Sequence, residues 1–316
     1  MRHLRALATE FPDWEVKVMR PAPPLVVPIE SGDGDPHLVG GKAASLIKLS
    51  RMGYLVPPGF CLTTEAFEAQ RRAIPGLGVQ IQALPDVAAR AELAVAFERT
   101  VLDPVVGDAL DAALHDLVQR VERTTGRTAR LAVRSSGMGE DSSAASFAGL
   151  HETELDVAPA DVRDAVRRCW ASLWSAPAVA YRQGRGLDAD GGGMAVVVQA
   201  LVPAEAAAVV FTRHPVTGSE DQIVITAVRG LGEAMVSGTV TPDTWVLDKA
   251  PRRTRDYAPG DRTEGQVGPA LDAPTLGDLV DLSLSVERSF GSAVDIEAAM
   301  AGGTWYLLQA RPITTR

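Results

Sequence analysis

The sequence predicts an α+β protein built from two lobes with a cleft between them. A chain of 316 residues is long enough to bury more than one core, and such chains divide more often than they enlarge a single core. Apolar spacings of three and four favour helices before residue 190, and short β-branched or aromatic runs favour strands after it. We expect an irregular N-terminal arm over residues 1–36, lobe 1 over 37–190 and lobe 2 over 191–316.

The first elements are predicted from turn residues and helical spacing. Prolines, acids and glycines in PAPPLVVP and ESGDGD favour an irregular arm. A Gly-Gly turn at 40–41 is followed by Leu46, Leu49 and Met52 at helical spacing. The residues Pro57-Pro58-Gly59 then open a short strand. This part of the chain is therefore expected to run turn, helix, turn, strand.

The later elements change in type near residue 190. Residues 65–125 predict several helices separated by prolines, and residues 161–175 predict another amphipathic helix. Residues 251–270 are polar and rich in turn residues, which favours a surface loop or hairpin. The strands expected after residue 190 are MAVVVQALV, AAAVVFT, DQIVITAV, TWVLDK and TWYLLQARPI.

Charge and composition exclude several classes of protein. A formal net charge of −9 and a pI near 5.1 argue against a nucleic-acid partner. Cys61 and Cys169 form no disulfide framework, which fits a reducing compartment. The N-terminal stretch lacks the apolar core of a signal peptide, and no apolar run approaches the roughly 20 residues of a membrane span. We expect a cytoplasmic protein without a membrane partner.

The first chemical motif is GGKAASL, residues 40–46. Glycines followed by a lysine at a helix start can bring backbone N–H groups and an ammonium against an anion, because a helix N-terminus is partially positive. The spacing differs from that of a P-loop. Taken alone, the motif favours an ordinary helix cap with a solvated Lys42.

The second motif is LAVRSSGMGEDSSAASFAGL, residues 131–150, in which a short strand ends on Arg134. The serines and glycines around Glu140 and Asp141 can form a loop that closes over phosphates, with Arg134 as a fixed bidentate charge. A solvated surface loop has the same composition, because glycine and serine populate turns. Both interpretations stay open at this point.

The third motif is VDIEAAMAGGTWYLLQARPI, residues 294–313. Asp295 and Glu297 alternate on one strand, so they share a face, and pairing across a Gly-Gly turn can bring Gln309 beside them. Arg311 follows on the same strand as Gln309. Carboxylate and amide oxygens suit Mg²⁺, which also takes oxygen from nucleotide phosphates. An exposed hairpin with solvated charges is the alternative.

Five blocks of the chain together resemble a known family. The blocks are GGKAASL…VPPGFCLTT, VRSSGMGEDSSAASFAG, VVVQALV…VVFTRHPVTG, GLGEAMVSGTVTPD and DIEAAM…WYLLQARPITT. In this order, over roughly residues 37–315, they resemble the signatures of the ATP-grasp nucleotide-binding domain shared by phosphoenolpyruvate synthase, pyruvate phosphate dikinase and rifampin phosphotransferase. The resemblance implies a two-lobed ATP-grasp fold with the nucleotide cleft between the lobes.

The resemblance also implies a reaction and its phosphate ligands. In that family Mg-ATP is split to AMP and phosphate, and the β-phosphoryl group passes to a histidine of a separate swivelling domain. By this likeness the chain is an ATP-dependent phosphotransferase that needs a partner domain. Lys42 and Arg134 would hold phosphates, Ser135 and Gly137 would lie in the covering loop, and Arg311 would clamp a phosphate oxygen.

Further roles are implied for the metal and the nucleoside. Glu297 and Gln309 would ligate Mg²⁺. The segment from Gln199 to Leu201 would form the hinge that faces adenine, with backbone groups offered to the base. Glu205 would reach the ribose hydroxyls. ATP and Mg²⁺ are therefore the expected cofactors.

Two positions depart from the family pattern. Glycine is usual where Ala43 stands, and a β-carbon there can crowd the approach of a phosphate. His214 stands where asparagine is common, and we interpret it as a turn side chain rather than a phosphoryl acceptor. The motifs contain no placed nucleophile, so the acceptor is expected on a phosphohistidine domain or subunit outside these residues.

Two questions stay open from the sequence. Relatives continue beyond RPITTR into further domains, so the chain is either a standalone subunit or a domain of a longer protein. A catalytically silent nucleotide-binding regulatory module is one alternative function, motivated by Ala43 and the missing acceptor. A kinase that phosphorylates a small molecule directly is the other, and the final acceptor is unknown in every case.

Overall fold

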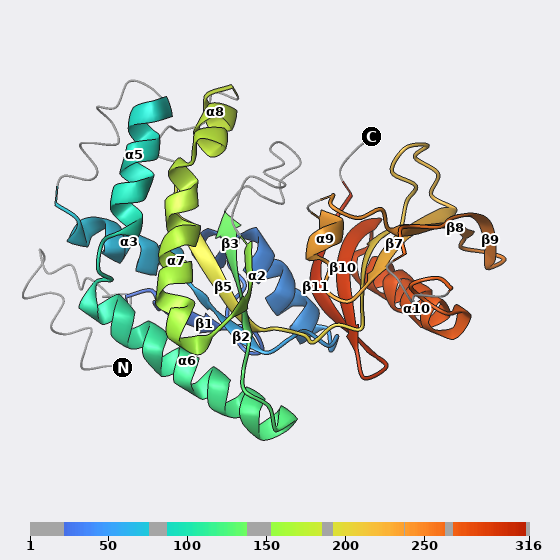
Figure 1. The fold of residues 1–316 in the computed structure, drawn as a ribbon, viewed down its shortest axis with the longest axis horizontal. Helices are drawn as coiled ribbons and strands as arrows, with labels where there is room; N and C mark the ends of the chain where they lie inside the picture. Colours follow the sequence, from blue (N-terminus) through green and yellow to red (C-terminus); the bar gives the residue numbers. More distant parts are fainter. Residues whose placement is uncertain are drawn as a thin grey trace, which may run out of the picture.

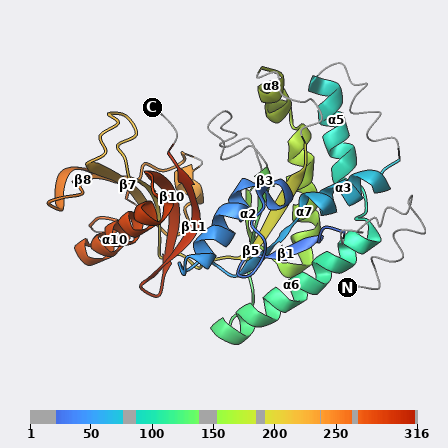
Figure 2. The ribbon, with the colours of Figure 1, turned by 180° about the vertical axis from the view of Figure 1, so that it is seen from behind.

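The computed structural model describes residues 22–75, 87–137, 153–184, 192–236, 238–262 and 268–313. Within these ranges the chain forms two antiparallel β-sheets with helices around them, which confirms the predicted α+β class (Figure 1). The two sheets lie toward opposite ends of the molecule in both views (Figures 1 and 2). None of the helices in these ranges has the length and apolar character of a membrane span.

The first sheet contains early strands and one later strand. Its strands are β1 (Val26–Pro28), β2 (Gly59–Leu62), β3 (Leu131–Gly137), β4 (Thr153–Val157) and β5 (Met194–Ala200). They pair in the order β1-β2-β5-β3-β4, so β5 lies at the centre of this sheet. The chain changes sheets after Ala200, not at the expected boundary of 190, because the composition shift marks where strands become frequent and not which sheet they join. The division into two domains stays a prediction.

The structure also differs from the expected irregular arm at Val26–Pro28. These residues form an edge strand, in which Val27 pairs with Cys61. An edge strand tolerates Pro28, because a proline needs no partner for a backbone donor. The following helix α2 (Pro36–Arg51) starts inside the expected arm as well, and its N-cap Asp35 accepts a hydrogen bond from the His37 N–H at 3.0 Å.

Helices cover both faces of the first sheet. One face packs against an aromatic core in which the Phe97 and Trp174 ring centroids are 5.0 Å apart, whereas the other face packs against α2. The helices predicted over 65–125 and 161–175 are confirmed. The elements of this core are α3 (Thr64–Ala73), α5 (Val87–Glu98), α6 (Pro104–Thr125), η1 (Pro159–Asp161), α7 (Val162–Ala171), η2 (Ser172–Trp174) and α8 (Ala176–Gly184).

The second sheet runs in the order β11-β10-β6-β7-β8-β9. One of its faces packs against α10 through a core that includes Ile225, Leu279 and Ile296. The strand β9 is exposed along its whole length, as expected for part of a surface hairpin. The elements are β6 (Ala206–Phe211), β7 (Gln222–Arg229), α9 (Glu233–Val236), β8 (Asp243–Asp248), β9 (Arg253–Ala258), α10 (Ala273–Phe290), β10 (Val294–Ala301) and β11 (Thr304–Pro312).

Helix α2 contacts both sheets and so joins the two halves. Ala43 and Leu46 are fully buried against the first sheet, whereas Leu49 belongs to the core of the second. The Ser45 hydroxyl donates to the Ala310 carbonyl of β11 and accepts from the Ala310 N–H at 3.3 Å. The position of this helix therefore decides how the polar residues of the two sheets meet.

Asp243 organises the loops that follow β8. Its carboxylate accepts from the Tyr257 hydroxyl at 3.0 Å, the Gly260 N–H at 2.8 Å, the Arg262 guanidinium at 2.6 Å and the Ala270 N–H at 2.5 Å. Burial raises the pKa of Asp243, but the hydrogen bonds from Gly260, Arg262 and Ala270 outweigh that effect and hold the pKa below its usual value. The charged form is therefore favoured in the folded state.

We expect Asp243→Asn to lower the free energy of unfolding at neutral pH by about 3 kcal/mol, because it leaves buried donors without their charged partner. The pKa of Asp243 is depressed on folding, so its contribution is present above the unfolded pKa of about 4 and declines as pH falls through the folded pKa. Urea denaturation from pH 7 to pH 3 measures this, and parent and variant should converge in acid. The exposed Asp278→Asn is the control, and an equal loss there would contradict the assignment.

Candidate functional site

The site begins at a break inside α2. Gly40 has φ +72° and ψ 173°, which interrupts the helix after its first turn. A Cβ built on Gly40 would lie 2.0 Å from the Ser136 carbonyl oxygen of β3. Only glycine combines this left-handed φ with so close an approach. The predicted Gly-Gly turn is thus a break that lets the helix pass directly over β3.

Lys42 follows this break and points back to the first sheet. Its ammonium donates to the Ser135 carbonyl at 2.9 Å. The predicted covering loop was wrong for Ser135 and Gly137, because both lie in β3 and pair with Val196 and Met194. Pairing with β5 extends the strand through residues whose composition favoured a loop. The rest of the predicted loop, 138–152, lies outside the described residues.

Arg134 reaches from the first sheet to the second. Its Nη2 donates to Glu297 Oε2 at 2.8 Å and to Gln309 Oε1 at 3.3 Å, and its Nη1 donates to the Leu308 carbonyl at 2.9 Å. The Arg134 side chain is only 11% exposed, against 37% for Glu297. The arginine predicted to face a ligand therefore already binds the two side chains predicted to hold a metal.

A β-bulge supplies one of these acceptors. Glu297 pairs with Gln309 and the next residue, Ala298, pairs with Leu307, so Leu308 is the extra residue of β11. A bulge leaves the extra residue outside the ladder and re-aims its groups. Here the Leu308 carbonyl accepts from Arg134. The sequence does not predict this contribution, because alternation of residue types does not reveal a bulge.

The predicted face of the β10–β11 hairpin is confirmed. Asp295 pairs with Arg311 in the same register that pairs Glu297 with Gln309. The Arg311 guanidinium donates to Asp295 Oδ2 from Nε at 2.9 Å and lies 2.8 Å from it through Nη2. With Arg134 added, the hairpin face carries two ion pairs side by side.

The charges of this group nearly balance. Lys42, Arg134 and Arg311 are cations, whereas Asp295 and Glu297 are carboxylates. Each arginine is matched by one carboxylate, and the Lys42 ammonium adds one positive charge. An incoming polyanion can therefore exchange places with the carboxylates around the guanidinium groups, which bind phosphate and carboxylate with similar geometry.

The predicted nucleoside residues lie elsewhere in the fold. Gln199 is buried, and its amide donates to the Pro57 carbonyl at 3.0 Å. The Leu201 N–H donates to the Arg130 carbonyl at 2.8 Å. These groups hold the first sheet together, so this segment offers fewer backbone donors than the sequence suggested.

Glu205 lies at the turn end of the β10–β11 hairpin. Its Oε1 accepts from the Gly302 N–H at 2.9 Å, and its own N–H donates to the Met300 carbonyl at 2.8 Å. Val209, four residues later, pairs with Glu297, and four extended residues span about 13 Å. Glu205 and the ion pairs therefore lie toward the two ends of one strand pair.

Two departures from the family pattern acquire a structural meaning. Ala43 is fully buried in the core between α2 and the first sheet, so its β-carbon packs there. The His214 Nδ1 accepts from the Val216 and Thr217 N–H groups at 3.2 and 3.3 Å. This confirms the interpretation of His214 as a turn side chain.

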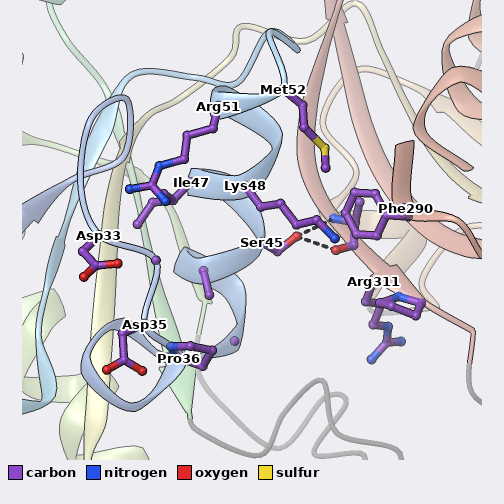
Figure 3. A pocket seen from close by; sticks show the side chains of 15 residues that line it. Asp33, Asp35, Pro36, Ser45, Ile47, Lys48, Arg51, Met52, Phe290 and Arg311 are labelled. Atoms are coloured by element: carbon purple, nitrogen blue, oxygen red, sulfur yellow. Dashed lines mark hydrogen bonds between the residues drawn. The ribbon is translucent and has the colours of Figure 1, made fainter. Parts of the chain in front are cut away.

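A cavity of about 770 Å³ adjoins Arg311 between α2, the end of α10 and β11 (Figure 3). Its lining includes Gly41, Ser45 and Lys48 of α2. The Lys48 ammonium lies 3.8 Å from the centroid of the Phe290 ring, a cation–π geometry. Arg311 therefore belongs both to this cavity and to the ion-paired hairpin face.

Comparison with known families identifies a family that matches most of the chain. The family described as the pyruvate phosphate dikinase AMP/ATP-binding domain matches residues 36–316. The chain belongs to this family. The pyruvate phosphate dikinase AMP/ATP-binding domain family uses ATP with Mg²⁺, which are the two cofactors expected from the sequence.

Relatives of this chain have names that denote different activities. A prodigiosin synthesizing transferase of Serratia marcescens is 38% identical over 93% of this chain and 34% of its own length. A probable phosphoenolpyruvate synthase of Methanothermobacter thermautotrophicus is 36% identical over 90% of this chain and 45% of its own length. A rifampicin phosphotransferase of Streptomyces sviceus is 37% identical over 88% of this chain and 34% of its own length. The chain thus spans less than half of each of these relatives.

We expect Gly40→Ala to lower the free energy of unfolding of the protein by about 3 kcal/mol. The alanine would have to adopt a left-handed conformation, and its Cβ would also collide with the β3 backbone. Gly291→Ala is the matched control, since Gly291 has φ +70° with nothing within 4 Å of its added Cβ. It should cost about 1 kcal/mol, the conformational part alone. Equal losses in chemical denaturation would show that the contact with Ser136 is unimportant.

Proposed function

We propose that this chain is the ATP-grasp nucleotide-binding part of a dikinase-type phosphotransferase. It binds Mg-ATP in the cleft between a lobe at 37–190 and a lobe at 191–316, splits it to AMP and phosphate, and passes the β-phosphoryl group to a histidine on a partner domain. The observation that carries the proposal is the meeting of Arg134 with Glu297 and Gln309 across the two sheets. A chain of an ATP-binding family that joins cations to metal-type ligands at one point is suited to a polyphosphate.

The phosphate end of the nucleotide is assigned to Lys42, Arg134 and Arg311. Both arginines form ion pairs with carboxylates, at 2.8 Å in each case. Triphosphate oxygens carry more charge than those carboxylates and accept bidentate hydrogen bonds from guanidinium. The cations would stabilise charge that develops on the transferring group, while Ser135 and Gly137 hold β3 beneath them.

The metal ligands of the proposal are Glu297 and Gln309. The two residues pair across the hairpin, their side-chain oxygens both accept from Arg134 Nη2, and such oxygens suit a hard cation. Within the described ranges, no cluster of three or more His, Cys, Asp or Glu side chains suitable for a metal occurs. Two protein oxygens with the rest supplied by phosphates and water match the habit of Mg²⁺. A bound Mg²⁺ would supply charge neutralisation at the phosphates.

The nucleoside end is assigned to Gln199, Leu201 and Glu205. Glu205 lies about 13 Å along the strand from the pair formed by Glu297 and Val209, so the residues assigned to the ribose and to the metal are well separated. Apolar groups and the carbonyls of the segment between the sheets would face adenine. Glu205 would reach the ribose from the hairpin turn, where its carboxylate accepts a hydrogen bond from the Gly302 N–H.

The acceptor is assigned to a phosphohistidine domain or subunit, and the final small-molecule acceptor is undetermined. The site described above contains acids, amides and cations but no placed nucleophile. Relatives that this chain covers over only 34–45% of their length have room for such a domain. A cytoplasmic location is part of the proposal, supported by the free and buried Cys61 and Cys169.

ATP labelled separately at the β and γ positions tests the reaction. With the acceptor domain present, we expect the β label on protein as an acid-labile phosphohistidine, the γ label as free phosphate, and AMP as the product. Without the acceptor domain, ATP should bind and hydrolyse slowly. Transfer of the γ label with ADP as the product would favour an ordinary kinase acting on a small molecule. If calorimetry detected no ATP binding, both the dikinase-type reaction and the kinase reaction would be ruled out.

Replacing Arg134 tests the site itself. Arg134→Gln should reduce turnover by about a hundredfold to a thousandfold, because a clamp on the transferring group is lost. In the nucleotide-free protein it should strengthen Mg²⁺ binding, because Glu297 and Gln309 lose the guanidinium that now occupies them.

Calorimetric titration with Mg²⁺, with and without ATP, measures the second effect. Arg163→Gln is the matched control, since it removes an arginine that pairs with Asp111 on the surface. Glu297→Gln should weaken Mg²⁺ binding in both conditions. If Mg²⁺ bound to Arg134→Gln and Glu297→Gln as it does to the parent, the assignment of Glu297 and Gln309 as Mg²⁺ ligands would be wrong.

A further inference from the structure

A hydroxyl from another element is inserted in the hydrogen-bond ladder of α2. In a continuous α-helix the Ala43 N–H would donate to the carbonyl of Val39, four residues earlier. In this protein the Ala43 N–H donates to Ser136 Oγ at 3.2 Å. The Ser136 hydroxyl in turn donates to the Val39 carbonyl at 2.8 Å. Ser136 therefore bridges the two backbone groups that the break at Gly40 separates.

This hydroxyl is held rigidly where the helix breaks. Ser136 is fully buried, and it pairs with Ala195 in the middle of the first sheet. An ideal Cβ on Gly40 would lie 2.4 Å from Ser136 Oγ, so the hydroxyl lies directly against the residue at which the helix breaks. A side chain that enters the i→i−4 ladder is a recognised cause of a helix kink. The strand thus imposes the break on the helix.

The break has a consequence for charge. A second helical run starts at Gly41, so a helix N-terminus with its partial positive charge lies inside α2 and directly before Lys42. The neighbouring residue Ser135 accepts from the Lys42 ammonium at 2.9 Å. Two consecutive residues of β3 therefore contact this region: Ser136 bonds to the backbone at the start of the second helical run, and Ser135 bonds to the Lys42 side chain. Without the hydroxyl, the Val39 carbonyl and the Ala43 N–H are free to bond to each other and to close the ladder.

We propose that Ser136 is a positioning residue for phosphate binding, which acts by holding α2 broken at Gly40 and so presents Gly41 and Lys42 to the nucleotide. The inference rests on the proposed function, because it takes Lys42 as a phosphate ligand. Ser136 itself does not touch the nucleotide. Ser136 therefore affects the affinity for ligands that carry phosphate and does not affect the affinity for a nucleoside without phosphate.

Ser136→Ala tests this assignment by calorimetry with ATP and with adenosine. We expect the Kd for ATP to rise at least tenfold and the Kd for adenosine to stay unchanged. The control is Ser283→Ala, which removes another fully buried hydroxyl, bonded to the Leu279 carbonyl of α10, and should change neither Kd. An unchanged Kd for ATP in Ser136→Ala, or equal losses for both ligands, overturns the proposal. A parent protein that binds no ATP overturns the proposed function instead.

A second experiment needs no nucleotide. The urea midpoint is measured for Gly40→Ala, Ser136→Ala and the double variant. We expect the shift caused by Gly40→Ala to be at least halved in the Ser136→Ala background, because the hydroxyl that imposes the break is gone. Additive shifts would mean that the hydroxyl does not hold the break and would overturn the inference even if ATP binds.

Discussion

The contact of Arg134 with the β10–β11 hairpin is the interaction on which the site depends. One guanidinium from the first sheet binds a carboxylate, an amide oxygen and a bulged carbonyl of the second. A largely buried arginine needs such partners, since desolvation of an unpaired charge costs several kcal/mol. The bulge at Leu308 meets part of this need, because it turns a carbonyl out of the ladder. The two sheets are thus joined by groups that also suit a phosphate and a metal.

Charge pairing gives the site a defined arrangement. The pairs of Arg134 with Glu297 and of Arg311 with Asp295 give each of these cations and carboxylates a partner of opposite charge. Such pairs contribute little net stability once desolvation is counted. A polyphosphate and its metal would replace one set of partners by another without leaving a buried charge alone.

Helix α2 transmits the geometry of the first sheet to this site. Its buried side chains belong to the cores of both sheets, and Ser45 bonds to the backbone of β11. Because the helix is fixed on both sides, its break at Gly40 occurs at a defined place above Ser136. The lysine after the break is then directed at the strand that carries Arg134. The packing of one helix therefore coordinates cations from different elements.

The sequence by itself determined what depends on near neighbours. The α+β class, most helices and the pairing of Glu297 with Gln309 follow from periodicity and from a short turn, which act within about ten residues. Tertiary structure decided the rest. Whether Ser135 and Gly137 form strand or loop depended on β5, and the partners of Arg134 and Ser136 lie 163 and 97 residues away along the chain. No local pattern encodes which distant backbone a buried hydroxyl or guanidinium meets, because that choice is made by the packing of whole elements.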